Sequence, residues 1–347
     1  MRRLVPALAA LGIAGCQAGY YAQLIHGQYE LLSRREPIAD VLARPDADAA
    51  LKARLERALD ARAFASSALA LPDNGSYRQY ADLQRPYALW NVFATPEFAM
   101  APHEWCYLFM GCLAYRGYYE LEAARAAADA LRAEGLDVHV GGVPAYSTLG
   151  WFDDPVLNTI LASDESLVGT IFHELAHQRR YVGGDTAFNE SFATFVEQEG
   201  LRQYYRDEPA RLERLGRRQR RDREFIGLML ESRQRLERIY GSALPADDMR
   251  RLKTEEFERL RRAYAEAKVG WDGDSAYDFW LAGELNNARL LPFGLYHQWV
   301  PAFAALFERA GRQWPAFLRE VDALAAADAA QRKAQLESNE SNGDAHN

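Results

Sequence analysis

A pair of histidines four residues apart limits the fold more than any other part of this sequence. They lie in residues 172–178, which read Phe-His-Glu-Leu-Ala-His-Gln. Residues four apart share one face of a helix, so His173 and His177 can bind the same metal ion. The apolar residues around them give that helix a flank to bury. The segment therefore predicts a buried helix with a metal site on one face.

Glu174, between the two histidines, supplies a second function to such a site. Zinc lowers the pKa of a bound water to near neutrality, and the hydroxide can attack a carbonyl carbon. A carboxylate beside a metal ligand can reach that water as a general base. A site that only binds metal needs no general base. We therefore expect Glu174 to be catalytic.

A catalytic zinc ion has three protein ligands and one open position. Gly183 and Gly184 are expected to end the first helix, and Asp185 or the threonine after it to cap a second. If the two helices pack side by side, Glu190 points back at the histidines. Asp185 is an alternative ligand, and Glu197 lies two turns beyond Glu190 on the same face. We predict one Zn²⁺ per chain, bound by both histidines and Glu190.

The first residues resemble an export signal. Arg2 and Arg3 precede an apolar run over residues 4–15, and Cys16 follows directly. The junction Ile-Ala-Gly-Cys resembles the lipobox of bacterial lipoproteins, which implies removal of residues 1–15 and acylation of Cys16. An ordinary signal peptide with a chance cysteine is the alternative. The acylated cysteine would anchor the protein to a membrane, and Gln17 resembles the sorting residue of outer-membrane lipoproteins that face the periplasm.

Cys106 and Cys112 would lie in an oxidising compartment after export. Gly111 can supply the turn that brings their sulfur atoms together, so we expect a disulfide. Two buried free thiols are the alternative. A metal site is disfavoured here, because no neighbouring histidine or cysteine completes a set of ligands.

The hydrophobic pattern predicts an α+β fold that is predominantly helical, in a single domain over residues 16–330. Strand-like segments are confined to residues 86–152, before the histidine helix, and the polar residues 331–347 are expected to be disordered. The expected helices cover residues 47–69 and 119–133 and most of the chain after residue 155, including two Arg- and Glu-rich helices over 207–268 that break near 241–245.

The charge balance disfavours one class of partner. The chain of 347 residues has a formal net charge of −8, from 41 Lys and Arg against 49 Asp and Glu. A protein that binds nucleic acid normally has a basic surplus, so we expect no nucleic-acid partner.

Residues 189–197 read Asn-Glu-Ser-Phe-Ala-Thr-Phe-Val-Glu. They resemble the Asn-Glu-Gly-Phe-Ala-x-x-x-Glu motif of the gluzincin metallopeptidases that include aminopeptidase N. The resemblance implies that Glu190 is the third zinc ligand and that Glu197 supports the site from behind. Only 12 residues separate His177 from Glu190, which is fewer than in aminopeptidase N.

Three further segments resemble a family of bacterial lipoproteins described as predicted aminopeptidases. They are residues 111–118, 145–155 and 285–290. The resemblance implies a zincin-like metallopeptidase with a small sheet before the histidine helix, Zn²⁺ as cofactor and a peptide as substrate. Residues 145–148 are a candidate edge strand along which an extended peptide could align.

Peptide hydrolysis also needs a hydrogen-bond donor for the oxyanion that forms on the carbonyl oxygen. Tyr296 is the first candidate, and His297 and Tyr277 are rivals. A tyrosine packed in the core is the alternative interpretation of Tyr296.

The polar side chains of Asn286, Asn287 and Arg289 lie in an otherwise apolar segment. They could bind the substrate backbone or support the metal ligands. A purely structural hydrogen-bond network is equally compatible with the sequence.

The sequence leaves three functions open. The first is a membrane-anchored zinc peptidase, of aminopeptidase type. The second is a lipoprotein that keeps the zinc site but acts as a binding or assembly factor in the envelope. A zinc hydrolase that acts on glycans or lipids is the third.

Overall fold

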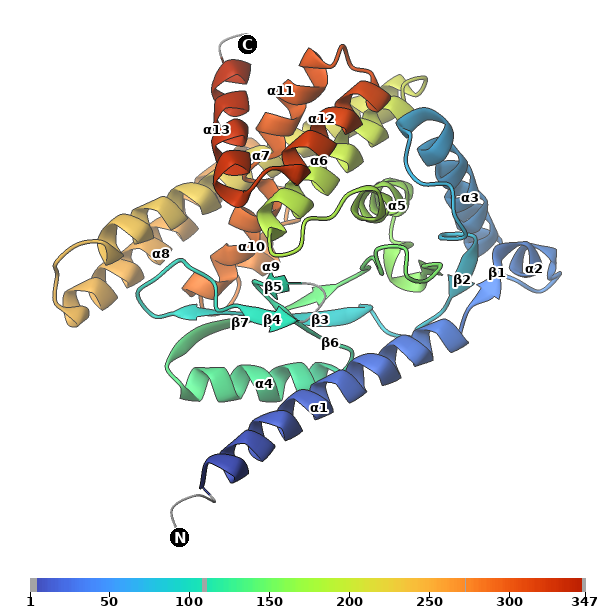
Figure 1. Cartoon of the computed structure of the whole chain (residues 1–347). Coiled ribbons are helices and arrows are strands. Elements are labelled where there is room, and N and C mark those ends of the chain that lie inside the picture. The colour runs from blue at the N-terminus through green and yellow to red at the C-terminus, as the bar shows by residue number, and fades with distance from the viewer. Residues whose placement is uncertain (1–4, 108–110, 272, 345–347) are drawn as a thin grey trace.

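A computed structural model of the chain describes residues 5–107, 111–271 and 273–344, and the side chains of residues 19–339 within them except Leu295 and Tyr296 (Figure 1). The described chain is predominantly helical with three small sheets, which agrees with the expected α+β class. The two termini lie at opposite ends of the molecule.

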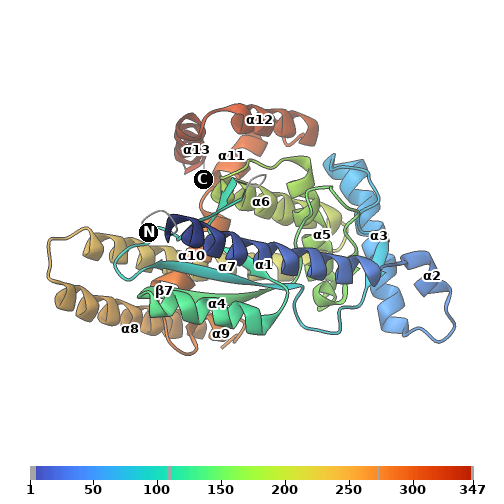
Figure 2. The same cartoon turned by 60° about the horizontal axis from the view of Figure 1, so that its bottom comes forward.

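The first helix, α1 (Val5–Ser33), runs along the outside of the molecule beside α4 (Figures 1 and 2). Its side chains fasten it to the strand β6 (Arg116–Tyr118). The guanidinium of Arg116 lies 3.7 Å from the centre of the Tyr20 ring, and Gln23 accepts a hydrogen bond from the backbone N–H of Tyr119. Of the helices in the described ranges, none combines the length and apolar character that a membrane crossing requires.

The largest sheet precedes the histidine helix, as expected. Its central strand β3 (Leu89–Pro96) pairs antiparallel with β6 on one side and with β7 (Leu136–Val143) on the other. The helix α4 (Leu121–Ala133) packs Ala124 and Ala128 against one face. The helix α10 (Asn287–His297) covers Phe93 on the opposite face. This sheet separates α1 and α4 from the helix that carries the histidines (Figure 1).

A second sheet was not expected from the sequence. It joins β1 (Glu36–Pro37), β2 (Gln79–Ala81) and β8 (Val156–Leu157), all outside the region predicted to hold the strands. Strands of two or three residues are too short to produce an alternating pattern. Residues 145–148, by contrast, form no strand. The side chain and backbone N–H of Thr148 bond to Asp154 instead, which folds the segment into a loop.

A short hairpin of β4 (Trp105–Tyr107) and β5 (Gly111–Leu113) carries the two cysteines opposite each other. The structure joins Cys106 and Cys112 in a disulfide, as expected from their spacing. Gly111 adopts a left-handed backbone conformation with a φ of 75°. A Cβ atom there would lie 2.8 Å from the backbone nitrogen of Gly184, so only glycine lets the hairpin pack this closely on that turn.

The main core is helical. Aromatic side chains from α5, α6, α11 and α12 interlock in it, including Phe172, Phe192, Phe303 and Phe317. The helices around this core are α2 (Ile38–Ala43), α3 (Ala49–Leu69), the 3₁₀ turn η1 (Asn158–Ile160), α5 (Asp164–Arg179), α6 (Thr186–Tyr204), α11 (Val300–Arg309), α12 (Trp314–Ala326) and α13 (Ala329–Asp344).

Residues 331–347 were expected to be disordered, but residues 331–344 belong to the helix α13, and residues 345–347 lie outside the described part of the structure. The helix packs against α11, and Leu336 is only 1% exposed. Arg332 is also buried and donates a hydrogen bond to Asp185, at the start of α6. Polar composition indicated disorder, but one apolar side chain and one paired arginine fix the first half of this helix.

The Arg- and Glu-rich segment forms two antiparallel helices, α7 (Pro209–Tyr240) and α8 (Ala246–Gly270), which break where expected. They project to one side in Figures 1 and 2. A separate apolar cluster, which includes Phe225, Leu260 and Trp271, joins them to the short helix α9 (Asp278–Leu281).

Candidate metal centre

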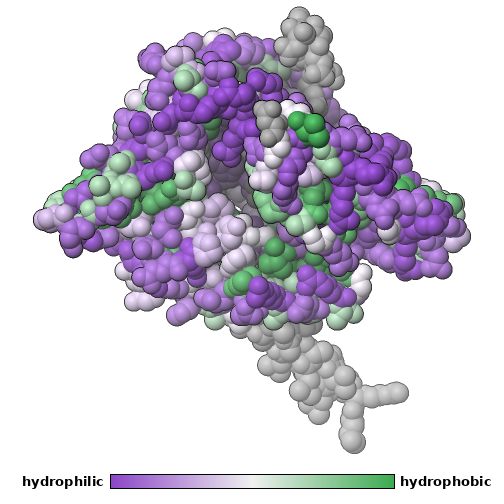
Figure 3. Space-filling model, turned by 180° about the vertical axis from the view of Figure 1, so that it is seen from behind, coloured by the Kyte–Doolittle hydropathy of each residue, from purple (hydrophilic) through white to green (hydrophobic). Residues whose placement is uncertain are grey.

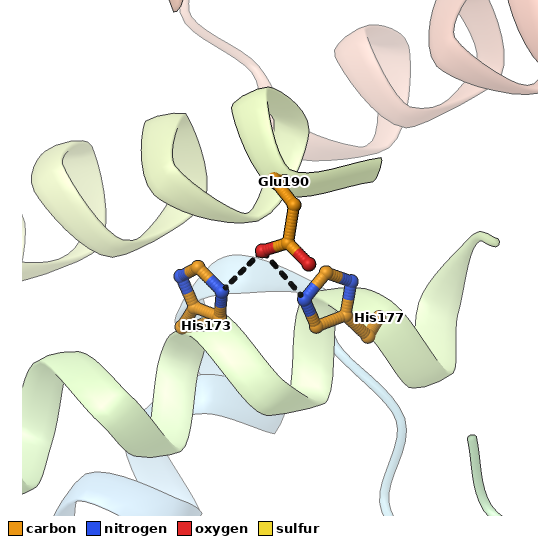
Figure 4. A group of neighbouring side chains, drawn as sticks. All are labelled: His173, His177 and Glu190. Atoms are coloured by element: carbon orange, nitrogen blue, oxygen red, sulfur yellow. Dashed lines mark ion pairs between the residues drawn. The ribbon is translucent and has the colours of Figure 1, made fainter. Parts of the chain in front are cut away.

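The helix α5 carries both histidines. Ser163 caps it by accepting a hydrogen bond from the backbone N–H of Ser166. Its apolar flank, which includes Phe172 and Leu175, is fully buried in the main core. This burial fixes the rotation of the helix and leaves the two imidazoles on the side that faces α6 (Figure 4).

Two glycines bring α6 close to α5. A Cβ atom on Gly169 would lie 3.0 Å from a carboxylate oxygen of Glu197, and one on Gly200 would lie 2.7 Å from the Phe172 ring. A side chain at Gly200 would clash with the Phe172 ring, and one at Gly169 would displace the side chain of Glu197. The close packing lets Glu190 reach the two histidines from above (Figure 4).

Three donor atoms converge between the helices. One carboxylate oxygen of Glu190 lies 3.4 Å from Nε2 of His173 and 3.6 Å from Nε2 of His177. The distances exceed the roughly 2.7–3.2 Å of a good N–H···O bond. Ligand atoms of a tetrahedral zinc ion, about 2.0–2.1 Å from the metal, lie about 3.3 Å apart. The spacing and the N₂O donor set therefore fit a metal ion, and the three residues form a possible metal site.

The charges in the centre also favour a cation. Burial alone would raise the pKa of Glu190, but the two imidazoles lower it to about 2. Burial alone would lower the pKa of His173, yet the carboxylates of Glu190 and Glu197 hold it well above its ordinary value. Glu190 is therefore an anion in a nearly buried site, where its charge is balanced by a protonated imidazole or by a metal ion that replaces the proton.

Glu197 contacts the site from the far side, as the resemblance implied. Its carboxylate lies 3.2 Å from Nδ1 of His173. Such a contact fixes the tautomer of an imidazole so that Nε2 is free for a metal. His177 has no such partner among the described residues, since its buried Nδ1 makes no hydrogen bond.

We predict that Glu197→Ala weakens metal binding by about 10- to 100-fold, because His173 loses the group that orients it. Glu197→Gln should lose less, since its amide oxygen still accepts the Nδ1 proton. Titration of the purified variants with Zn²⁺ measures both affinities. Equal affinity in the alanine variant and the wild type would contradict this role.

Glu174 is available as a base. It is 7% exposed, and no described residue donates a hydrogen bond to its carboxylate. Burial is the largest influence on this group and raises its pKa above the ordinary value. A raised pKa brings a carboxylate closer to the neutral range in which a general base works best.

The residues on either side of Glu190 have roles that the sequence did not reveal. Asn189 is buried, and its amide bonds to both the N–H and the carbonyl of Val182 at 2.8 Å. These two hydrogen bonds hold the connection between α5 and α6 against the start of α6. Ser191 accepts a hydrogen bond from the backbone N–H of Trp299 and so fixes the start of α11.

The alternative ligand Asp185 is not brought to the centre. One of its oxygens caps α6 by accepting from the N–H of Phe188, and the other binds Arg332. Both oxygens of Asp185 are thus occupied by structural contacts.

The polar residues of α10 support the fold and not the metal site. Asn286 caps α10 and donates to the carbonyl of Val138. Asn287 is fully buried, donates to carbonyls of the turn after β3 and accepts from Tyr240. Arg289 donates to the carbonyl of Phe279. Of the two interpretations, the structural network is the one that these contacts support.

The three expected oxyanion donors lie in different environments. The side chain of Tyr296 is outside the described part of the structure. Tyr277 stacks on Phe225 and donates a hydrogen bond from its hydroxyl to Asp222. Its hydroxyl proton is therefore not available to an oxyanion. Burial lowers the pKa of His297 to about 4. The charges of Glu197 and Glu190 raise this pKa and that of His173 lowers it, but all three have less influence than burial. His297 is therefore a neutral imidazole beside the centre.

Charges of the centre act on Tyr115, a residue to which no sequence pattern assigned a role. Burial, followed by the charge of Glu190, raises its pKa well above the ordinary value. In the sequence, its segment carries only the family resemblance. Tyr181, whose ring centre lies 6.4 Å from that of His177, is a further neighbour.

Gln178, directly after the second histidine, ties the back of α5 to two loops. It accepts a hydrogen bond from Asn74 and donates to Ser76 and Asp154. These contacts immobilise the end of the helix next to His177.

The centre is buried but not sealed, since the side chains of His173, His177 and Glu190 keep 14%, 8% and 9% exposure. Figure 3 shows a hollow near the middle of one face of the molecule. Hydrophilic residues gather along its upper rim.

The side chain of Cys16 lies outside the described part of the structure, so its acylation stays a prediction. Comparison with known proteins found one family model, which matches residues 19–336. No curated protein and no solved structure matches the chain. Because the family match covers most of the sequence, the chain belongs to the family described as "Putative aminopeptidase".

Proposed function

We propose that this protein is a zinc-dependent peptidase, of aminopeptidase type, with a zincin-like catalytic centre. The observation that carries the proposal is the convergence of His173, His177 and Glu190 with Glu174 unpartnered beside them. Two imidazoles and one carboxylate are a common donor set of catalytic zinc. The family to which the chain belongs supports the choice of a peptide as substrate.

Each residue of the centre has a part in this reaction. His173, His177 and Glu190 would hold the zinc ion, and Glu197 would keep His173 oriented. A bound zinc ion acidifies water and polarises the scissile carbonyl. Glu174 takes a proton from the attacking water as its oxygen bonds to the carbonyl carbon. The same carboxyl then returns that proton to the departing nitrogen as the C–N bond breaks.

A peptide-library digest tests this function. The full chain, purified in mild detergent and loaded with Zn²⁺, should cleave a defined set of library peptides. The position of the cuts distinguishes removal of N-terminal residues from internal cleavage. Absence of any cleavage by fully loaded protein would contradict the peptidase and favour a binding or assembly factor.

We also propose that the protein is anchored to the membrane through an acylated Cys16, on the outer membrane facing the periplasm. The lipobox at residues 13–16 supports this proposal. From Tyr20 onward, α1 is fastened to β6. Four residues span at most about 14 Å even when fully extended. The catalytic body would therefore stand close to the membrane surface.

We predict that Cys16→Ser moves the protein from the membrane fraction to the soluble fraction or leaves it unprocessed, because the acyl chains would be missing. Fractionation of cells followed by immunoblotting measures this. The double variant Cys106→Ser with Cys112→Ser is the matched control, since it removes the other two cysteines, which form the disulfide, without touching the lipobox. Unchanged membrane association of the Cys16 variant would contradict the anchor.

A further inference from the structure

Three large hydrophobic side chains are exposed along one face of α1. Tyr21, Ile25 and Tyr29 lie four residues apart, so they follow one another on the same face of the helix. They are 38%, 71% and 70% exposed, and no other described helix carries more than one large hydrophobic side chain in the exposed class. Single exposed apolar side chains are common on protein surfaces, whereas a contiguous group marks a binding surface. We call these three residues the outer face of α1.

The opposite side of α1 holds the helix in one rotation. Tyr20 is buried beneath the guanidinium of Arg116, and Leu31 is only 3% exposed. A Cβ atom on Gly27 would lie 2.1 Å from the ring of Tyr119, so the helix packs there as closely as glycine allows. Because these contacts fix the rotation of α1, the outer face cannot turn inward and bury itself against the protein.

The outer face also lacks the charges of a helix that faces water. Residues 19–29 contain no Asp, Glu, Lys or Arg. The neighbouring helix α4, on the same side of the molecule in Figure 2, has an outward surface with two ion pairs, Arg125 with Glu122 and Arg132 with Asp129. A polar, charged surface of that kind is usual for the solvent side of a helix. On α1, tyrosine and isoleucine take its place, and tyrosine is enriched where proteins meet the headgroups of a membrane.

The proposed anchor brings a lipid surface to this face. Cys16 precedes Tyr21 by five residues in the same helix, and five residues rise about 8 Å along a helix. The acyl chains on Cys16 would lie in the membrane, so Tyr21 would be within reach of its headgroups. Ile25 and Tyr29 follow at one-turn intervals. A lipid surface is therefore the partner that the position and the chemistry of the outer face both favour.

We propose that the outer face of α1 lies on the membrane, with Tyr21, Ile25 and Tyr29 among the lipid headgroups. The proposal rests on the proposed acylation of Cys16. Acyl chains alone hold a protein at the membrane and leave it free to turn on its tether. Contacts spread over two turns of α1 would lay this helix along the surface. The histidine helix lies beyond the largest sheet, so the metal centre would face away from the lipid and toward dissolved peptides.

A polarity-sensitive dye on the outer face tests this contact. The full-length Ile25→Cys variant is labelled and bound to vesicles of phosphatidylethanolamine and phosphatidylglycerol. Cys106 and Cys112 form a disulfide and acylation would occupy Cys16, so the introduced thiol takes the dye. Its emission should shift to shorter wavelength and should resist quenching by iodide. Ala330→Cys is the matched control, because it is exposed on α13, on the opposite side of the molecule from α1, and its dye should stay quenched.

A charge on the outer face should lift it from the lipid. With the dye on the Tyr29→Cys variant, addition of Ile25→Glu should restore quenching by iodide to the level of the α13 control. Ala126→Glu is the matched change on the exposed side of α4 and should leave the dye protected. Both substituted positions are exposed, so the fold should be unaffected. Both proteins should still float with the vesicles, because the acyl chains remain.

Two results would overturn the proposal. The first is equal quenching of the Ile25→Cys and Ala330→Cys dyes on vesicles. The second is protection of the Ile25→Cys dye without vesicles, in dimers that analytical ultracentrifugation detects and Ile25→Glu separates, since the outer face would then bind a second copy of the chain. Failure of the anchor itself would be seen separately, as a mature protein whose mass lacks the acyl chains.

Discussion

Replacement of Glu174 by glutamine should lower kcat/KM by about two to four orders of magnitude and leave the bound metal in place. The amide of glutamine has nearly the shape of the carboxylate but cannot accept the proton of the attacking water. Glu174 is not one of the three converging residues, so zinc affinity should change little. Kinetics with the best library peptide, together with metal analysis of the same preparation, measures both effects.

Glu165→Gln is the matched control for this experiment. Glu165 lies on the same helix, in its first turn, and pairs with Arg211. The same change of charge there should leave turnover unaltered. If Glu174→Gln were as active as the wild type, the observed cleavage would come from another site or from a contaminant.

Replacement of Glu190 by glutamine should remove metal and activity together. A neutral amide is a poorer zinc donor than a carboxylate, and the two imidazoles would lose the anion that now lies between them. We expect affinity for Zn²⁺ to fall by more than the roughly 100-fold that loss of a supporting contact causes. Titration with Zn²⁺ gives the affinity, and peptide cleavage at saturating metal gives the remaining activity.

Glu199→Gln provides the comparison on α6. Glu199 binds Arg202 and Arg312 away from the centre, so its neutralisation should leave zinc affinity unchanged. Full zinc occupancy in Glu190→Gln would show that the ligand assignment is wrong. The two main variants together separate the roles, because Glu174→Gln should keep the metal and Glu190→Gln should lose it.

Local geometry explains what could be predicted from the sequence. Residues four apart share a face in any helix, so the relation of His173 to His177 needs no knowledge of the rest of the fold. The turn at Gly183 and Gly184 and the cap at Asp185 are equally local. With a connection this short, the second helix packs against the first, and Glu190 lies near the histidines as predicted.

Local patterns did not determine which distant residues complete the site. Asn287 has the same polarity whether it binds a substrate or a buried carbonyl. Only the packing of α10 on β3 shows that it binds a buried carbonyl. The helix α13 looks disordered by composition, but Leu336 and Arg332 find partners on other helices.

Tyr115 illustrates the same limit most clearly. The chain has 18 tyrosines, and nothing in the sequence around Tyr115 shows that the charge of Glu190 acts on it. Its position depends on β3, α10 and the contact between Gly111 and Gly184, which belong to separate parts of the chain. The sequence by itself determined the histidine pair, its base and the third acidic residue, because helix and turn geometry are local. Tertiary structure alone decided which side chains surround them, since packing between distant segments is not encoded in any short pattern.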